Sequence, residues 1–108
     1  MMDSVQVVDA FPDGTGVTEV LDSAMMGGGP VPTALCAASR LGARAGIIDR
    51  VGSDWAGDLI RHEYRVYGVN TEYLQFESGC RSSFGNVLVR RGDGERHIVF
   101  RAGNFSPF

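Results

Sequence analysis

Three consecutive glycines followed by a proline, residues 27–30, stand directly before an alanine-rich stretch that ends at Gly42. Prolines in the first turn, alanine filling and a glycine just beyond the end are the start and stop signals of a short helix. Leu35, Ala38 and Leu41 fall on one face of that helix, and their small neighbours let the face lie close to a sheet. The sequence therefore predicts a helix over residues 31–41, entered through a glycine-lined bend.

A strand pattern and a second helix pattern follow this helix. Residues 45–48 are apolar and predict a buried strand that ends at Gly52. Residues 55–67 predict a helix, which Ser53 or Asp54 can cap by accepting a hydrogen bond from an unpaired backbone N–H. Gly68 then ends the helix. The order helix, strand, helix, with glycines at the junctions, is typical of an α/β layer.

The remaining segments favour strands. Five have the length and apolar content of strands, the second of them as an edge strand: residues 5–8, 17–21, 73–76, 82–90 and 95–101. The last two flank Arg91-Gly92-Asp93-Gly94, which predicts a β-hairpin. We interpret Arg90 and Arg91, beside this turn, as exposed guards of a sheet edge.

The composition excludes several classes of protein. The chain has 108 residues, the size of one small domain, and no apolar run approaches the ~20 residues of a membrane span. Its net charge of −3 argues against binding to nucleic acid, whose phosphates need a basic face. All ten basic residues are arginine. Without lysine, neither a lysine-dependent phosphate loop nor a Schiff-base lysine is available.

Cysteine and histidine usage points away from disulfides and metal sites. Cys36 and Cys80 lie far apart, and His62 and His97 add no cluster with metal-ligand spacing. We therefore expect reduced cysteines, no metal ligands and a cytoplasmic location. Cys36 is interpreted as a small core residue of the first helix.

The best candidate for a ligand site is the glycine run that opens the first helix. Gly28 and Gly29 let a ligand approach the backbone, and the start of a helix offers unpaired N–H groups. Such a place suits oxygen-rich ligands, either phosphates or sugar hydroxyls. The alternative is a tight turn that needs flexible residues and binds nothing. The spacing does not fit GxGxxG, so a dinucleotide site is not supported.

Five blocks of the sequence resemble, in the same order, the ribokinase-like (PfkB) family of carbohydrate kinases. The longest is residues 28–42, which is similar to the family's N-terminal signature. The others are residues 8–12, before the first lid strand; 51–59, similar to VGxDxxG; 67–71, similar to the GV-D/N-T helix end; and 93–96, similar to the usual hairpin turn. Together the blocks extend along nearly the whole chain, from residue 8 to residue 96.

This resemblance implies an α/β fold, namely part of a Rossmann-like three-layer domain with a small β-sheet lid over the site. Residues 1–108 would form the N-terminal part of such a domain, with lid-type strands at about 10–26, an α/β core at about 28–76 and a β-hairpin at about 82–101. The activity implied is ATP-dependent phosphorylation of a hydroxyl on a sugar or nucleoside. ATP and Mg²⁺ are expected as cofactors of the full-length enzyme.

The resemblance also implies substrate contacts. Asp3 falls where the family places an aspartate that binds a substrate hydroxyl, and a carboxylate suits this role because it accepts two directed hydrogen bonds. Gly28 and Gly29 match the glycine pair that lets the sugar reach the backbone. Thr33 stands where the family usually has asparagine, so it keeps one hydroxyl but loses the amide's paired donor and acceptor. Without the resemblance, Asp3 would be interpreted as a frayed, solvated terminal residue.

The family's catalytic aspartate, in a C-terminal GAGD-type motif, has no counterpart in this sequence. We therefore expect an N-terminal fragment that carries sugar-binding and lid elements but no catalytic base or ATP site, and that is inactive alone. The alternative is a truncated, non-catalytic sugar-binding or interaction module. The expected partner is a sugar or nucleoside, without nucleic acid or membrane, and the resemblance allows a homodimer through lid strands. We also expect weak stability in isolation, because an incomplete parallel sheet exposes apolar surface.

Overall fold

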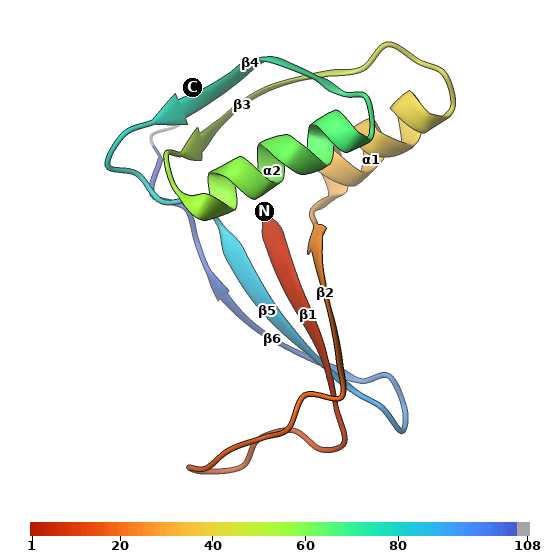
Figure 1. Cartoon of the computed structure of the whole chain (residues 1–108), viewed down its shortest axis with the longest axis vertical. Coiled ribbons are helices and arrows are strands. Elements are labelled where there is room, and N and C mark those ends of the chain that lie inside the picture. The colour runs from red at the N-terminus through yellow and green to blue at the C-terminus, as the bar shows by residue number, and fades with distance from the viewer. Residues whose placement is uncertain (106–108) are drawn as a thin grey trace.

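A four-stranded sheet and a two-stranded sheet meet beside two helices (Figure 1). The computed structural model describes residues 1–105. The elements, in chain order, are β1 (Met2–Val8), β2 (Asp22–Gly27), α1 (Pro30–Arg40), β3 (Gly46–Gly52), α2 (Trp55–Val66), β4 (Asn70–Glu77), β5 (Phe84–Arg90) and β6 (Arg96–Arg101). No helix in this part of the chain is long and apolar enough to cross a membrane.

The four-stranded sheet combines the beginning and the end of the described chain. Its strand order is β2-β1-β5-β6. β1 pairs antiparallel with β2 and parallel with β5, and β5 and β6 form the predicted antiparallel hairpin. Asp3, on β1, therefore lies between Met26 of β2 and Gly85 of β5.

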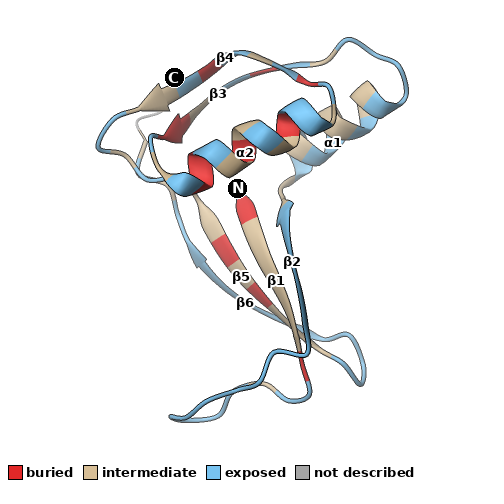
Figure 2. Ribbon diagram, in the orientation of Figure 1, coloured by how far each residue is buried: buried red, intermediate tan, exposed pale blue. Residues whose placement is uncertain are grey.

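Residues 30–77 form the predicted α/β layer. The parallel strands β3 and β4 are connected by α2, and Asp54 caps this helix by accepting a hydrogen bond from Gly57 N at 2.8 Å. Gly68, with a φ of +78°, follows α2 as the expected terminating glycine. The core is formed by side chains of both sheets, α2 and the connection before β4: Met2, Ile47, Val51, Ile60, Tyr64, Val69 and Leu74. Figure 2 marks buried segments in red on α2 and on strands of both sheets.

The predicted edge strand at residues 17–21 is wrong. Residues 9–21 contain no strand, and the edge strand β2 begins at Asp22 instead. Gly14 and Gly16 have positive φ values of 64° and 148°, which interrupt an extended chain, and Val17 is fully exposed. Of the lid-type strands expected at about 10–26, only the last residues of that range are therefore in a strand.

The interpretation of Arg90 and Arg91 as edge guards is also wrong, because β5 is an inner strand. Arg90 Nη2 donates to Asp93 Oδ2 at 2.6 Å across the hairpin turn, and the guanidinium lies 4.9 Å from the centre of the Phe11 ring. Arg91 forms an ion pair with Asp9. The two arginines therefore hold loops together at the end of the four-stranded sheet that is remote from the helices.

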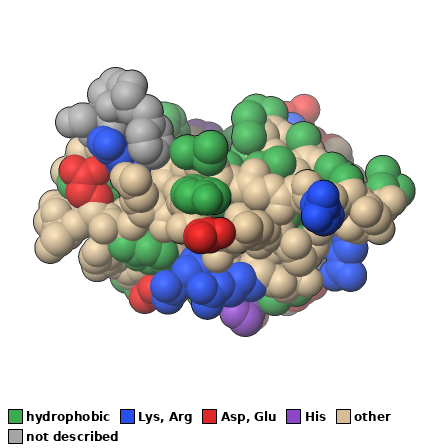
Figure 3. All heavy atoms as spheres, turned by 90° about the horizontal axis from the view of Figure 1, so that it is seen from above, with side chains coloured by type: hydrophobic (Ala, Val, Ile, Leu, Met, Phe, Trp, Pro, Cys, Tyr) green, Lys and Arg blue, Asp and Glu red, His purple; other side chains and the backbone are tan. Residues whose placement is uncertain are grey.

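Only one face of the two-stranded sheet is covered. Ile47, Val51 and Leu74 are buried, whereas Ile48 and Tyr73 are 73% and 60% exposed. The prediction of a buried strand at residues 45–48 therefore holds for one face of β3 and is wrong for the other. Seen from above, the surface carries hydrophobic side chains among its arginines and acidic groups (Figure 3).

Candidate functional site

A glycine bend (residues 27–29) leads from the end of β2 into α1. Gly29 has a φ of +104°, which favours glycine, and it is the N-cap of α1 without any side-chain hydrogen bond. Gly28 N donates to Met1 O at 3.0 Å. The glycine bend therefore runs directly beside the beginning of β1.

Asp3 lies inside the sheet with a strand on each side, so it is not the frayed terminal residue of the alternative interpretation. Its carboxylate occupies the space that two glycines leave open. A Cβ built on Gly28 would overlap Asp3 Oδ2, and a Cβ built on Gly85 would lie 2.6 Å from Asp3 Oδ1. The carboxylate fits here because both neighbours lack a side chain.

The Asp3 carboxylate lacks a hydrogen-bond donor. Oδ1 is shielded from solvent and has no hydrogen-bond partner among residues 1–105. Desolvation raises the pKa of Asp3, although the nearby terminal amino group of Met1 acts in the opposite direction. An unsatisfied buried acceptor costs about 1–3 kcal/mol. A hydrogen-bond donor from a bound ligand would remove this cost and so would bind favourably at Asp3.

Thr33 lies in the first turn of α1, directly after the glycine bend, whereas Asp3 lies on β1. Its Oγ1 donates to Gly29 O at 2.7 Å, and its backbone N donates to the same oxygen at 3.1 Å. The hydroxyl proton is thus engaged, while the Oγ1 lone pairs remain able to accept. Pro30 and Pro32 have no N–H, so the helix start offers fewer unpaired donors than a helix start usually does.

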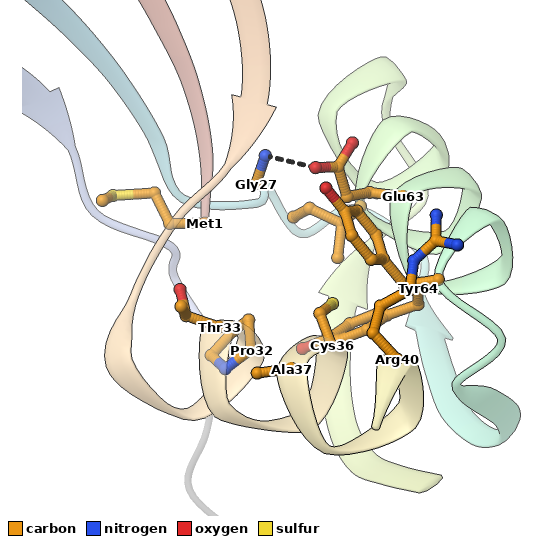
Figure 4. A pocket seen from close by; sticks show the side chains of 11 residues that line it. Met1, Gly27, Pro32, Thr33, Cys36, Ala37, Arg40, Glu63 and Tyr64 are labelled. Atoms are coloured by element: carbon orange, nitrogen blue, oxygen red, sulfur yellow. Dashed lines mark hydrogen bonds between the residues drawn. The ribbon is translucent and has the colours of Figure 1, made fainter. Parts of the chain in front are cut away.

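The four predicted substrate contacts therefore meet at one place, since Asp3 packs against Gly28 and Thr33 is bonded to Gly29. A pocket of about 270 Å³ adjoins this place, between α1 and α2 (Figure 4). Thr33 lines it, but Asp3 does not. The residues that line the pocket are Met1, Gly27, Pro32, Thr33, Cys36, Ala37, Arg40, Ile60, Glu63, Tyr64 and Tyr67.

The polar side chains of the pocket are mostly neutral or engaged. Glu63 Oε1 accepts a hydrogen bond from Gly27 N at 3.1 Å, which joins α2 to the glycine bend. Burial, with smaller effects from Asp49 and Cys36, raises the pKa of Tyr64 to about 12. Burial also raises the pKa of Cys36, which is partly buried and packs against the core but is not the core residue that the sequence predicts. The pocket thus presents a largely apolar wall beside the bend.

Gly85 is a site residue that sequence reasoning missed. It lies in the interior of β5, and a glycine inside a strand often marks the close approach of another group. That signal is present in the sequence. Its partner, Asp3, can be named only once the parallel pairing of β1 with β5 is known.

The fold described above matches about a third of the ribokinase fold. The crystal structure of a putative ribokinase from Agrobacterium tumefaciens matches with a TM-score of 0.84 at 26% identity, over 94% of this chain and 33% of that one. The ribokinase of Arabidopsis thaliana complexed with ribose and ATP matches with a TM-score of 0.78 at 18% identity and the same coverage. The chain therefore has a partial ribokinase-like α/β fold, as predicted.

Sequence comparison gives the family. The profile of the pfkB family of carbohydrate kinases matches residues 1–108. Probable fructokinase-5 of Arabidopsis thaliana is 30% identical and fructokinase-1 of Zea mays 33% identical, each over 97 residues that cover 87% of this chain and 29% of the relative. The chain belongs to the pfkB family of carbohydrate kinases. It spans less than a third of the length of these curated relatives.

Proposed function

We propose that this chain forms the sugar-binding wall and part of the lid sheet of an ATP-dependent kinase that transfers a γ-phosphoryl group to a carbohydrate hydroxyl. The observation that carries the proposal is the Asp3 carboxylate, which lies between two glycines with Oδ1 shielded and unpartnered. A sugar hydroxyl would supply the missing donor in a charge-assisted hydrogen bond. Membership in a family of carbohydrate kinases supports the same class of ligand.

Each proposed contact has its own role. Asp3 accepts hydrogen bonds from sugar hydroxyls and fixes their direction. Gly28 and Gly29 present bare backbone, so a sugar ring can come close. Thr33 accepts through Oγ1, because its proton is bonded to Gly29 O. A sugar is favoured over a phosphate at this bend, because the Asp3 carboxylate repels anions and the prolines of α1 remove helix-start donors.

ATP enters the proposal for the whole enzyme through the structural neighbours, and Mg²⁺ enters it through the family resemblance alone. The Arabidopsis ribokinase is complexed with ribose and ATP, and the ribokinase of Cryptococcus neoformans with ADP. Within residues 1–105, no group of three or more His, Cys, Asp or Glu side chains could hold a metal ion. Because the family's GAGD-type motif has no counterpart in this sequence, the proposal places the catalytic base and the nucleotide contacts outside this chain and expects the chain alone to be inactive.

The proposal also includes a cytoplasmic location, a sugar or nucleoside substrate, and a homodimer that pairs through the four-stranded sheet. β2 and β6 are the edges of this sheet, and Ile98, Val99 and Phe100 of β6 are 53–64% exposed. An exposed apolar edge strand favours pairing with another strand. The second candidate is a non-catalytic sugar-binding or interaction module. The exposed edge favours the interaction module, and the presence of all four proposed sugar contacts in this chain favours the sugar-binding one.

Calorimetric titration of the 108-residue chain with D-fructose, D-ribose and adenosine tests the binding site. Asp3→Asn should lower the affinity roughly 10- to 100-fold, and Asp13→Asn, in the exposed loop, should leave it unchanged as the charge-matched control. Absence of heat with every compound, or equal binding by both variants, would contradict the proposal.

An ATP-consumption assay with the same compounds separates the two candidates. It compares this chain with a longer polypeptide that carries a complete kinase domain. Turnover by the longer polypeptide but not by this chain supports the first candidate, part of a carbohydrate kinase. Binding without turnover by either supports the non-catalytic module, and turnover by the short chain contradicts the assignment of catalysis to residues outside it.

A further inference from the structure

Asp54 joins the two sheets at the place where α2 begins. Its Oδ1 accepts hydrogen bonds from Gly57 N at 2.8 Å and from Ser82 Oγ at 2.7 Å, and its Oδ2 accepts from Ser82 N at 2.9 Å. Ser82 Oγ accepts in turn from Gly52 N at 2.9 Å. One carboxylate thus caps a helix of the α/β layer and also holds the residue that leads into β5. We call Asp54 and Ser82 the interlayer clasp.

The interlayer clasp is enclosed by backbone. Ser82 is 1% exposed and is the one buried polar residue among residues 1–105. A Cβ on Gly57 would overlap Gly52 O and lie 3.1 Å from Ser82 Oγ. A Cβ on Gly52 would lie 2.9 Å from Arg81 Cα. These two glycines therefore let β3, α2 and the start of β5 approach closely enough for the clasp to form.

Two further contacts cross the same junction. Arg101, at the end of β6, donates from Nη2 to Ser82 O at 3.3 Å and lies 3.8 Å from Asp54 Oδ2. Trp55 packs edge-on against Phe84 at the start of β5, with ring centres 4.8 Å apart. Because Trp55 is the one tryptophan of the chain, its spectrum reports on this junction.

Ser82 shortly precedes Gly85, which lies opposite Asp3 in the parallel strand pair. We propose that Asp54 is a positioning residue: by holding Ser82 it fixes the start of β5 and thereby keeps Gly85 against the Asp3 carboxylate. That Asp54 keeps Gly85 against Asp3 depends on this fold alone. Its consequence for sugar binding rests on the proposed function.

The charge of Asp54 is consistent with this role. Desolvation alone would raise the pKa of Asp54, but hydrogen bonds from Ser82 and Gly57, with Arg101 nearby, bring it below its ordinary value of 3.8. Both carboxylate oxygens are therefore available as acceptors at neutral pH. Asparagine in this position would keep one accepting oxygen and turn an NH₂ donor toward Ser82 N.

Three variants distinguish the effect of the Asp54–Ser82 hydrogen bonds from the effect of capping α2. Asp54→Ser keeps an N-cap side chain but has only one oxygen, so the hydrogen bonds to Ser82 are lost. Ser82→Ala leaves the cap of α2 untouched and removes the Oγ hydrogen bonds. Asp58→Asn is the control, because it removes the same charge from an exposed carboxylate in the first turn of α2 that pairs with Arg61.

The decisive measurement is the titration of the Asp3 carboxyl by ¹³C NMR, assigned by its absence in Asp3→Asn. In Asp54→Ser and Ser82→Ala, the Asp3 pKa should move toward its ordinary value of 3.8, and the near-ultraviolet circular dichroism of Trp55 should weaken. The affinity for the sugar that the wild type binds should fall roughly 10- to 100-fold. Helix content should stay unchanged, and Asp58→Asn should match the wild type throughout.

An unchanged Asp3 titration in the folded variants would overturn the proposal, because a purely structural clasp would alter stability without reaching Asp3. If Asp54→Ser does not fold, Ser82→Ala decides, and if neither folds, Asp54→Asn decides, since it keeps the cap and one accepting oxygen. A wild-type chain that binds no sugar would count against the proposed function. The Asp3 titration would still decide the role of Asp54.

Discussion

Gly85 and Asp3 face each other across the parallel pair of β1 and β5, and the Asp3 carboxylate lies over the bare Cα of Gly85. Gly28 leaves the space on the other side of the same carboxylate. Since Oδ1 has no hydrogen-bond partner among residues 1–105, its orientation depends on the shape of this gap. Filling the gap should therefore change binding before it changes the fold.

Gly85→Ala should weaken sugar binding more than it lowers stability. The added methyl group would lie 2.6 Å from Asp3 Oδ1, so the carboxylate has to turn away. Overpacking typically costs about 1–3 kcal/mol, and the rotatable Asp3 side chain should keep the loss of unfolding free energy near the lower limit. Calorimetry with the bound sugar and urea unfolding of the same sample measure the two effects.

Gly92→Ala is the matched control for this substitution. Gly92 lies in the exposed hairpin turn, and a Cβ there would meet no atom within 4 Å. Equal sugar affinities of Gly85→Ala and Gly92→Ala would show that the gap around Asp3 does not govern binding.

Asp3→Asn should stabilise the fold at neutral pH while it weakens sugar binding. Desolvation raises the pKa of Asp3, so ionisation is less favourable in the folded than in the unfolded chain. Protonated Asp3 therefore contributes to the free energy of unfolding. This contribution is fully present below pH 3.8 and is lost as the pH rises through the raised pKa of the folded chain. Asparagine does not ionise and escapes this loss. Sugar affinity should fall roughly 10- to 100-fold, because a hydrogen bond to a charged acceptor contributes about 1.5–3 kcal/mol.

Urea unfolding of the wild type and Asp3→Asn between acidic and neutral pH measures the stability effect. The difference in unfolding free energy should grow across the titration of Asp3 and then remain constant. An Asp3→Asn variant that is less stable than the wild type at neutral pH would contradict the expectation.

Tyr64 should ionise only near pH 12. Its side chain is 3% exposed, and burial raises the pKa to about 12, whereas the unfolded phenol has the ordinary value of 10. Stability should accordingly decrease as the pH rises from 10 to about 12. An ultraviolet absorbance titration should show this late step, and Tyr64→Phe should remove it. Ionisation of Tyr64 near pH 10 would contradict its burial.

Leu74→Ala should lower the free energy of unfolding by about 2–5 kcal/mol, because it leaves a cavity in the core. Leu74 is 6% exposed and packs with Ile47, Val51 and Ile60. Ile48→Ala, at a side chain that is 73% exposed, should stay within about 0.5 kcal/mol of the wild type. Urea unfolding of both variants checks this contrast. A large loss from Ile48→Ala would mean that another surface covers that face in solution.

Elements with strong local signals are predictable from this sequence. The limits of α2 follow from a capping side chain at Asp54 and a glycine at Gly68, and the structure contains both. The hairpin of β5 and β6 follows from apolar alternation around a glycine-containing turn. In each case, residues close in the sequence determine the conformation.

Features that depend on distant partners are not predictable in this way. Residues 17–21 alternate like an edge strand, but alternation does not specify a partner, and β1 pairs with residues 22–27 instead. The hairpin pattern does not show that β5 is also hydrogen-bonded to β1, so the sequence predicts an edge position for Arg90 that the structure does not have. The position of Asp3 at the glycine bend came from the family resemblance. The contact of Gly85 with Asp3 becomes apparent only from the parallel pairing of β1 and β5, and the hydrogen bonds of Ser82 only from the packing of α2 against the start of β5.

The strand pair that places Met2 opposite Phe84 also affects the order in which the sheets can form while the chain is being synthesised. The α/β layer is one continuous stretch and β1 can pair with β2 early, but the β1–β5 pair cannot form before residues 84–90 have been made. Closing so long a loop adds an entropic barrier, and contacts of this kind slow folding. We therefore expect the surroundings of Asp3, which need Gly85 of β5, to be among the last parts of the fold to form.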